Sequence, residues 1–542
     1  MLRMREPLTT SQWSRDDSVP LVEYTVGSLL AERARTHGDA LALVGTAHGT
    51  GEQRRLTYRD LYTEARRVAT ALLRLAEPGE FVALWAPNVI EWPVIQYGAA
   101  LAGMTLVALN PVLRADELVY AVNHSRAAVL LHADVSRDYD LAAVAASVRS
   151  RCPALREVVS LSARERWLAE SGDLPATADV QDAGAPVMLQ YTSGTTGLPK
   201  GVLLRHRSLV NVAKLSAQRA EVEPGAMQVN PLPMFHTAGC VVATLGSLWL
   251  GGCMVLVEQF RPALVLELME KEQATVLFCV PAMLGALVEA ARDAGGTAPA
   301  LRTVAVGGAN VPAALVEATR QLFGARVHIM YGQTELAPTL SATGRSDTPE
   351  DLTHTVGRPL PQVECKIVDP VTGAVQPLGT PGEICARGYQ QMIEYLHDPE
   401  STARTVDAGG WVHTGDLGAM DARGVITVTG RLKELIIRGG ENIAPVEIET
   451  CLLGHEAVLE AAVVAVPDER MGEAVAAVVR LAGEQPAGLR DALVEHCRAR
   501  LAKYKVPQHW YVADEMPVTP AGKVRKFKLR DAVTAGTLRD LD

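Results

Sequence analysis

The sequence predicts an α/β protein with two domains, and three observations support this prediction. The chain has 542 residues, well beyond the roughly 250 to 300 that one hydrophobic core usually serves. Helical and strand patterns alternate from residue 21 to about residue 180, which is typical of a parallel sheet flanked by helices. After Lys433 the pattern changes to a compact unit. We expect a large domain of β-sheets flanked by helices at 1–432 and a small α+β domain at 433–542.

Local patterns place the elements along the chain. Residues 25–44, 56–75 and 81–87 alternate helical and strand patterns. The apolar runs PVMLQY (186–191) and GVLLR (201–205) predict two strands joined by a loop, followed by a helix that begins near residues 206–208. In the small domain we expect strands near 460–466 and 474–481, a helix near 487–502, and an earlier helix that begins with Pro445.

The longest uncharged segment covers residues 237–257 and is nominally long enough to span about 30 Å of hydrocarbon. Gly251 and Gly252 divide it into a helical part and a strand-like part, and neither end carries the basic and aromatic anchors of a spanning helix. We therefore expect it to lie in the protein interior and predict no membrane span.

Composition excludes several classes of function. With 48% hydrophobic and 21% charged residues the chain is an ordinary globular protein, and its net charge of −10 argues against a nucleic-acid or acidic-membrane surface. The eight cysteines show no metal-ligand spacing and are expected to be buried thiols in a reducing cytosol. The N-terminus lacks an apolar signal core, so a cytoplasmic location is expected.

The run YTSGTTGLPKGV at 191–202 concentrates hydroxyls, glycines and one lysine. Gly194 and Gly197 allow positive φ, which brings backbone N–H groups close to an anion. A Walker loop would place glycine before the lysine and Ser or Thr after it, whereas Pro199 and Gly201 stand there. The alternative is a Gly/Thr-rich surface turn. The donors of the predicted triphosphate cradle are Thr192, Ser193, Thr195, Thr196 and Lys200.

This loop resembles the phosphate-binding motif of the adenylate-forming superfamily, which includes acyl-CoA synthetases, aryl-CoA ligases, firefly luciferases and the adenylation domains of peptide synthetases. Three further stretches match that superfamily: YGQTE at 331–335, WVHTGD at 411–416 and GRLKELIIRGGENIAPVEIE at 430–449. The resemblance implies an ATP site formed by Thr192, Ser193, Gly194, Thr195, Thr196, Gly197, Lys200, Gly308, Ala309, Tyr331, Gly332, Gln333, Thr334, Glu335, Asp416, Arg431 and Lys523.

Within that site the resemblance gives individual roles. Tyr331 stacks on adenine, and Glu335 holds Mg²⁺ with Thr192, which agrees with the preference of Mg²⁺ for one or two protein oxygens plus phosphates. Asp416 accepts from the ribose hydroxyls, although Thr-Gly-Asp alone is common turn chemistry. Ile329 stands where many relatives have Asn or Gln for the adenine amine.

The resemblance also makes the small domain a mobile lid. Lys433 is its hinge, Gly439, Gly440 and Glu441 line the pantetheine tunnel, and Lys523 meets the substrate carboxylate and the α-phosphate. A charged run such as the one around Lys523 is otherwise an ordinary solvated face.

The acyl pocket is expected near PLPMFHTAG (231–239) and VGGAN (306–310). His236 stands at the start of the apolar run, where a lone histidine is by default a packing residue. Peptide-synthetase members carry an aspartate there, so Phe235 and His236 argue against an α-amino acid substrate. The expected pocket residues are His236, Gly239, Cys240, Val241, Gly307 and Gly308.

These parts imply that ATP activates a carboxylic acid to acyl-AMP and pyrophosphate, and that coenzyme A then takes the acyl group. A medium or long fatty acid is expected, and catalysis is assigned to Lys523, His236, Lys200, Glu335 and Thr192 with Mg²⁺. Three alternatives stay open: loading of an acyl carrier protein, luciferase-type oxidation, and an inactive nucleotide-binding relative. The resemblance implies a monomer or homodimer.

Overall fold

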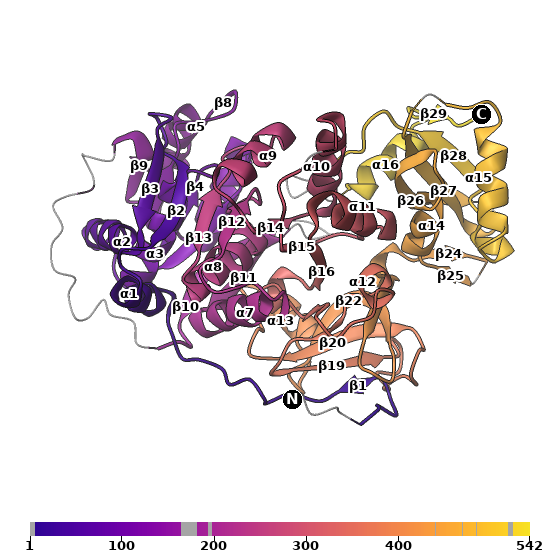
Figure 1. The fold of residues 1–542 in the computed structure, drawn as a ribbon, viewed down its shortest axis with the longest axis horizontal. Helices are drawn as coiled ribbons and strands as arrows, with labels where there is room; N and C mark the ends of the chain where they lie inside the picture. Colours follow the sequence, from indigo (N-terminus) through magenta and orange to yellow (C-terminus); the bar gives the residue numbers. More distant parts are fainter. Residues whose placement is uncertain are drawn as a thin grey trace.

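The computed structural model describes residues 6–163, 168, 182–192, 198–296, 298–439, 441–468, 470–483, 485–518 and 524–542, and of Asn442 only the backbone. Three sheets form the bulk of the molecule, and the small C-terminal domain, yellow in Figure 1, has a sheet of its own. The predicted fold class is therefore confirmed.

A seven-stranded sheet carries the glycine-rich hairpin. Its strands from β10 to β9 are parallel, as the alternating pattern predicts, whereas β11 and β21 extend one edge antiparallel. The predicted strand–loop–strand arrangement is confirmed, because β10 pairs with β11. The strand order is β21 (Glu394–Tyr395), β11 (Lys200–Arg205), β10 (Pro186–Thr192), β5 (Thr105–Leu109), β4 (Phe81–Trp85), β6 (Val129–His132) and β9 (Glu157–Ser160).

A nine-stranded sheet carries the YGQTE run at the end of its strand β16. Its six inner strands are parallel, and the remaining three are antiparallel additions at the two edges. The order is β18 (Arg358–Pro359), β17 (Ser341–Ala342), β16 (Arg326–Tyr331), β15 (Thr303–Gly307), β14 (Val276–Cys279), β12 (Met227–Asn230), β13 (Cys253–Leu256), β2 (Leu41–Thr46) and β3 (Gln53–Thr57).

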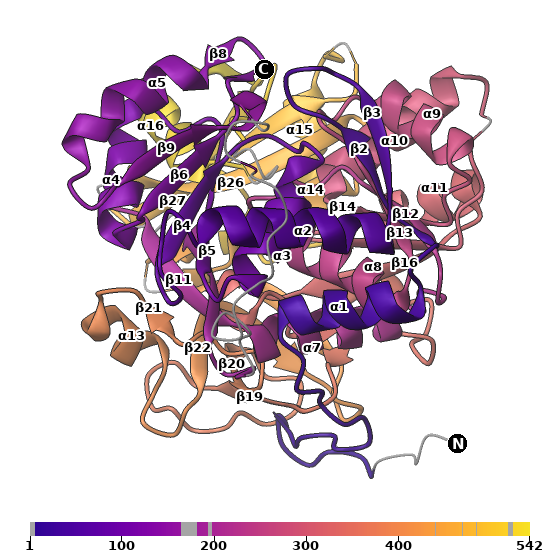
Figure 2. The same cartoon turned by 90° about the vertical axis from the view of Figure 1, so that its left-hand side faces the viewer.

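Helices fill the space between these two sheets. Strand β13 shows this directly: Met254 and Leu256 pack in the core that contains the seven-stranded sheet, whereas the alternate residues Cys253 and Val255 pack in a second core on the opposite face. Figure 2 shows α1, α2 and α3 between the two sheets. The inner helices are α1 (Val26–Thr36), α2 (Tyr58–Leu72), α3 (Glu91–Leu101), α7 (His206–Arg219) and α8 (Thr244–Leu250), and the second core lies under α9 (Pro262–Lys271), α10 (Pro281–Asp293) and α11 (Ala313–Phe323).

Local chemistry fixes several helix ends where the sequence predicts them. Thr57 caps α2, since its hydroxyl accepts from the backbone N–H of Asp60 at 3.1 Å and the Asp60 carboxylate accepts from Thr57. Helix α7 begins at His206, and α14 (Pro445–Leu453) begins at Pro445. Both helices therefore begin where the sequence predicts.

The long apolar segment lies in the interior. It forms a π-helix at Ala238–Ala243, then α8, and Gly251 ends that helix with a left-handed φ of +64° before β13 begins. The break at the two glycines is therefore confirmed, and the π-helical turn was not predicted. Within the described part of the chain, no helix combines the length and apolar character needed to cross a membrane.

In Figure 1 a five-stranded sheet forms the lower part of the large domain, and a separate sheet forms the core of the small domain. The five-stranded sheet has the order β1 (Gln12–Trp13), β19 (Val363–Val368), β20 (Gly382–Gly388), β22 (Val412–Met420) and β23 (Ile426–Arg431). In the small domain β26 (Val458–Asp468), β27 (Gly472–Leu481) and β28 (His509–Val512) lie between α14, α15 (Leu489–Arg498) and α16 (Lys526–Thr534), with β24 (Ile436–Arg438), β25 (Glu441–Ile443) and β29 (Arg539–Asp540) at the edges.

One short 3₁₀ turn, Leu432–Glu434, joins the two domains and contains Lys433. The domains also touch beyond this turn: Asn310 of the large domain donates to the Thr450 hydroxyl of α14 at 3.2 Å. The boundary at Lys433 stays a prediction.

Candidate active site

The glycine-rich hairpin presents Thr192 and Lys200 as its last paired residues. Antiparallel pairing holds their backbones side by side, so the tip of the hairpin starts from a fixed base. Five residues of the predicted ATP site lie outside the described residues: Ser193, Gly194, Thr195, Thr196 and Gly197.

Lys200 has two close partners. Its Nζ donates to the Ser401 hydroxyl at 2.7 Å and lies 4.8 Å from the centre of the Tyr395 ring. The ring is held by strand pairing, since Tyr395 of β21 lies opposite Val202 of β11. The ammonium group is thus oriented before any phosphate arrives, partly through the attraction between a cation and the face of an aromatic ring.

Glu335 follows the end of β16 and is 9% exposed. Its Oε1 accepts from the Tyr395 hydroxyl at 2.6 Å, and its backbone carbonyl accepts from the N–H of Met392 at 2.9 Å. Burial, together with the charge of Glu335, raises the pKa of Tyr395, so its hydroxyl remains a donor. A fixed carboxylate, with the Thr192 hydroxyl in the neighbouring hairpin, is a donor set that fits Mg²⁺.

A second group surrounds Asp416, which is 3% exposed. Tyr331 donates its hydroxyl to Oδ2 at 2.8 Å, and the Nε of Arg431 lies 2.8 Å from Oδ1. Burial and the charge of Asp416 raise the pKa of Tyr331, which therefore stays protonated. Tyr331 and Glu335 lie at the carboxyl end of β16, and the Tyr331 contact brings Asp416 of β22 to the same place.

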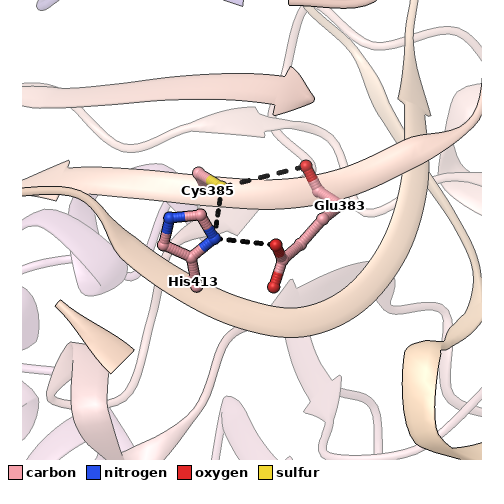
Figure 3. A group of neighbouring side chains, drawn as sticks. All are labelled: Glu383, Cys385 and His413. Atoms are coloured by element: carbon pink, nitrogen blue, oxygen red, sulfur yellow. Dashed lines mark hydrogen bonds and ion pairs between the residues drawn. The ribbon is translucent and has the colours of Figure 1, made fainter. Parts of the chain in front are cut away.

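The turn that carries Asp416 is braced from β20. Between the pairs Glu383–Leu417 and Cys385–His413, strand β22 has extra residues, and Gly415 takes a left-handed φ of +70°. Glu383 holds this bulge, because its Oε2 accepts from Nδ1 of His413 at 2.7 Å (Figure 3). Its Oε1 accepts from the backbone N–H of Gly415 at 3.1 Å. The bulge turns Asp416 toward Tyr331 and Arg431.

Glu383, Cys385 and His413 also bring three potential metal-ligand atoms within 4.8 Å of one another. However, His413 Nδ1 already contacts Glu383, and Cys385 Sγ lies 3.5 Å from the same ring nitrogen. Burial raises the pKa of Cys385 to about 12, which disfavours the thiolate that binds metals. We therefore assign this cluster to bracing the turn.

The acyl-pocket residues divide into two groups. Gly307 ends β15 and Gly308 follows it. A Cβ at Gly307 would lie 2.3 Å from the carbonyl oxygen of Met330, so a side chain there would clash with β16. His236 is half-buried, with its ring 5.1 Å from that of Phe235. In contrast, the expected pocket residues Gly239, Cys240 and Val241 are fully buried, and Cys240 Sγ contacts the Gln190 amide at 3.2 Å inside the large core.

Five more predicted site residues belong to the junction and the lid. Lys433 is exposed in the 3₁₀ turn, Gly439 has a φ of +60° beside Met471, and Glu441 begins β25. Gly440 and Lys523 lie outside the described residues. Of the remaining predicted residues, Ala309 is exposed after Gly308, and Gly332, Gln333 and Thr334 connect Tyr331 to Glu335.

Four residues of this site were missed in the sequence. Tyr395, Ser401 and Glu383 act on Lys200, Glu335 or the turn before Asp416 across long separations, so no local spacing identifies them. His413 lies in the WVHTGD run itself, three positions before Asp416, but its contact is with the distant Glu383. One local pattern was available: Asp398 caps α13 (Pro399–Thr405) by accepting from the N–H of Ser401 at 2.9 Å. This cap places Ser401 next to the lysine.

Comparison with known proteins gives a consistent result. Residues 30–396 match the profile of the AMP-binding enzyme family, and residues 447–523 that of the AMP-binding enzyme C-terminal domain. The chain is 34% identical to a putative acyl-CoA synthetase, YngI, of Bacillus subtilis, covering 94% of this chain and 97% of that protein. It is 32% identical to the mitochondrial medium-chain acyl-CoA ligase ACSF2 of Bos taurus, covering 94% and 87%.

Solved structures agree in fold over nearly the whole chain. The anthranilate CoA ligase AuaEII in complex with anthranoyl-AMP has a TM-score of 0.85 at 26% identity, covering 96% of this chain and 99% of that one. ATP-bound MatB from Rhodopseudomonas palustris has a TM-score of 0.82 at 28% identity, covering 94% and 99%.

Proposed function

This chain belongs to the AMP-binding enzyme family and is an AMP-forming acid–CoA ligase, and on this premise we propose that its acid is an aliphatic carboxylate of medium or long chain. The proposal depends mainly on the apolar residues next to Gly307 and Gly308. A Cβ at Gly308 would lie 3.7 Å from Val280, and Met330 flanks Gly307. Both side chains pack on an apolar cluster whose other members include Ala238, Val242, Phe278, Met283 and Ala305.

The charges near this cluster argue against a second carboxylate on the substrate. A dicarboxylic acid would need a cation, because a buried anion is stable only when it is paired. Arg302, just before β15, and Arg326, the first residue of β16, lie at the strand ends opposite Gly307, and both already form ion pairs, with Glu223 and Glu221. An alkyl chain needs no such partner and gains about 0.8 kcal/mol for each CH₂ that it buries.

The first half-reaction joins two anions. A carboxylate oxygen of the acid attacks the α-phosphorus of ATP, the bond between that phosphorus and the bridging oxygen breaks, and pyrophosphate leaves. Catalysis must therefore neutralise and position charge, and no protein nucleophile is required. We assign Lys200 to the outer phosphates, Asp416 to the ribose hydroxyls and Lys523 to the attacked phosphate. Mg²⁺, held by Glu335 and Thr192, supplies further positive charge when it is bound.

In the second half-reaction the thiol of coenzyme A attacks the acyl carbonyl, AMP leaves, and the thiol proton passes to solvent or to the departing phosphate. We propose that Lys433 is the hinge on which the lid turns between the two steps, because such a hinge only needs to absorb a large change in φ and ψ. Gly439, Gly440 and Glu441 would then line the route of the pantetheine arm. We further propose that the enzyme works in the cytoplasm as a monomer or homodimer.

Thioester formation from panels of acids tests this proposal. The purified enzyme is incubated with ATP, Mg²⁺ and coenzyme A, and with fatty acids from hexanoate to stearate, benzoate-type acids or dicarboxylic acids. Acyl-CoA and AMP are quantified by mass spectrometry. We expect the highest kcat/KM with a fatty acid. Preference for an aryl acid, which the likeness to AuaEII makes the second candidate, would refute the aliphatic assignment.

A parallel arm replaces coenzyme A by an acyl carrier protein with its phosphopantetheine arm. Faster loading of the carrier protein would change the assigned acceptor and leave the assigned acid unaffected. Pyrophosphate release that does not depend on any added acid would contradict ligase activity altogether.

A further inference from the structure

Tyr395 contacts both Lys200 and Glu335. It is 6% exposed, and its position is fixed from two sides. Strand pairing sets it opposite Val202, and its backbone N–H donates to the Thr402 hydroxyl at 2.9 Å. From this position the hydroxyl reaches Oε1 of Glu335 at 2.6 Å, while the face of the ring receives the Lys200 ammonium group at 4.8 Å.

The two contacts keep opposite charges apart. A lysine and a glutamate at the rim of one site are attracted to each other, and a direct ion pair would occupy the groups that the phosphates and the metal need. In this structure Lys200 instead contacts the Tyr395 ring and the Ser401 hydroxyl, and Glu335 Oε1 instead contacts the Tyr395 hydroxyl. Both partners are neutral, so none of these contacts pairs Lys200 or Glu335 with an opposite charge.

We propose that Tyr395 is a positioning residue for nucleotide binding: its hydroxyl orients the Glu335 carboxylate toward the metal, and its ring keeps the Lys200 ammonium group directed at the outer phosphates. The inference rests on the proposed function of the same site, since it assigns no new substrate. Groups that orient metal ligands from outside typically change metal affinity by about 10- to 100-fold when removed.

Two substitutions separate the two roles. Tyr395→Phe removes the hydroxyl and keeps the ring, so it should affect Glu335 and spare Lys200. Tyr395→Leu removes both. Tyr389→Phe is the matched control, because it makes the same change on the same segment at a tyrosine whose hydroxyl has no hydrogen-bond partner among the described residues.

Metal binding provides the decisive measurement. Binding of Mn²⁺, as a probe for Mg²⁺, is followed by electron paramagnetic resonance in the presence of a non-hydrolysable ATP analogue. For Tyr395→Phe we expect about tenfold weaker Mn²⁺ binding, unchanged affinity for the analogue without metal, and unchanged thioester formation from preformed acyl-AMP. For Tyr395→Leu the metal-free affinity for the analogue should also fall. Tyr389→Phe should match the wild type in all three measurements.

Unchanged Mn²⁺ affinity in Tyr395→Phe would overturn the inference, as would an equal loss of metal-free analogue binding, because a general structural defect would lower both. The proposed function fails separately: wild-type enzyme that binds Mn²⁺ and the analogue but activates no acid would refute ligase activity while leaving the role of Tyr395 intact.

Discussion

Acid is expected to destabilise the large domain through His206, the first residue of α7. The side chain is 1% exposed, and its Nδ1 accepts a hydrogen bond from the backbone N–H of Val26 at 3.0 Å. Burial lowers the pKa of His206 from 6.5 to about 4, and the charge of Asp182 opposes this only in part. The native state therefore keeps a neutral imidazole at pH values where the unfolded chain is already protonated.

The pKa of His206 is 6.5 in the unfolded chain and about 4 in the native state. At about 1.4 kcal/mol per pKa unit, this difference can change the free energy of unfolding by about 3 kcal/mol. Above the unfolded pKa of 6.5 both states are neutral, and the histidine has its full stabilising effect. As the pH falls the unfolded state takes up the proton first, so stability decreases until the native pKa near 4 is reached. By about pH 5 the loss should be about 2 kcal/mol.

The assay compares wild type with His206→Asn by urea unfolding between neutral pH and about pH 5. The asparagine Oδ1 can accept from Val26 but does not titrate. The free energies of unfolding of the two proteins should therefore converge by about 2 kcal/mol as the pH falls. His354→Asn, at an exposed position at the end of α12 (Asp351–His354), is the control. If the wild-type and His206→Asn curves run parallel, the reasoning is refuted.

Three further predictions concern the reaction. Lys523→Ala should abolish acyl-AMP formation yet largely spare thioester formation from preformed acyl-AMP; equal loss of both in single-turnover assays would contradict its role. Lys433→Pro should slow the thioester step more than the adenylation step, because proline fixes φ at the proposed hinge, and equal slowing would count against a hinge there. Glu383→Ala should raise the KM for ATP about tenfold with little change for coenzyme A, since two hydrogen bonds of roughly 1 kcal/mol each hold the turn before Asp416; an unchanged KM would show that the turn needs no brace.

The sequence predicts those parts of the fold that depend on local chemistry. The apolar flanks of the glycine-rich loop predict the β10–β11 hairpin, and the pair Gly251–Gly252 predicts the change from helix to strand. The π-helical turn at Ala238–Ala243 has no such pattern, because it differs from an α-helix only in which carbonyl each N–H reaches. The turn contains Cys240 and Val241, and the side chains of both are buried in the core.

The candidate site also contains some residues that a local sequence pattern reveals and others that it does not. Its motif residues can be found in the sequence because each lies in a run with a recognisable composition. Tyr395 cannot be found in this way: β21 has two residues, which is too short to show any periodicity, and the partners of Tyr395 are separated from it by 60 and 195 positions along the chain. The pairing of β21 with β11 brings Tyr395 to Lys200, and the backbone hydrogen bond from Met392 to the Glu335 carbonyl brings the same segment to Glu335.

The pairing around Asp416 is compatible with its proposed second role as an acceptor for the ribose hydroxyls. Each carboxylate oxygen offers two lone pairs. Arg431 uses one on Oδ1 and Tyr331 uses one on Oδ2, so one acceptor position remains on each oxygen. Two remaining acceptors match the two vicinal hydroxyls of a ribose, and the nucleotide need not displace either protein partner. The existing contacts also fix the plane of the carboxylate, which reduces the side-chain entropy lost on binding. The arrangement therefore favours a ligand with a pair of hydroxyl donors over a single-donor ligand.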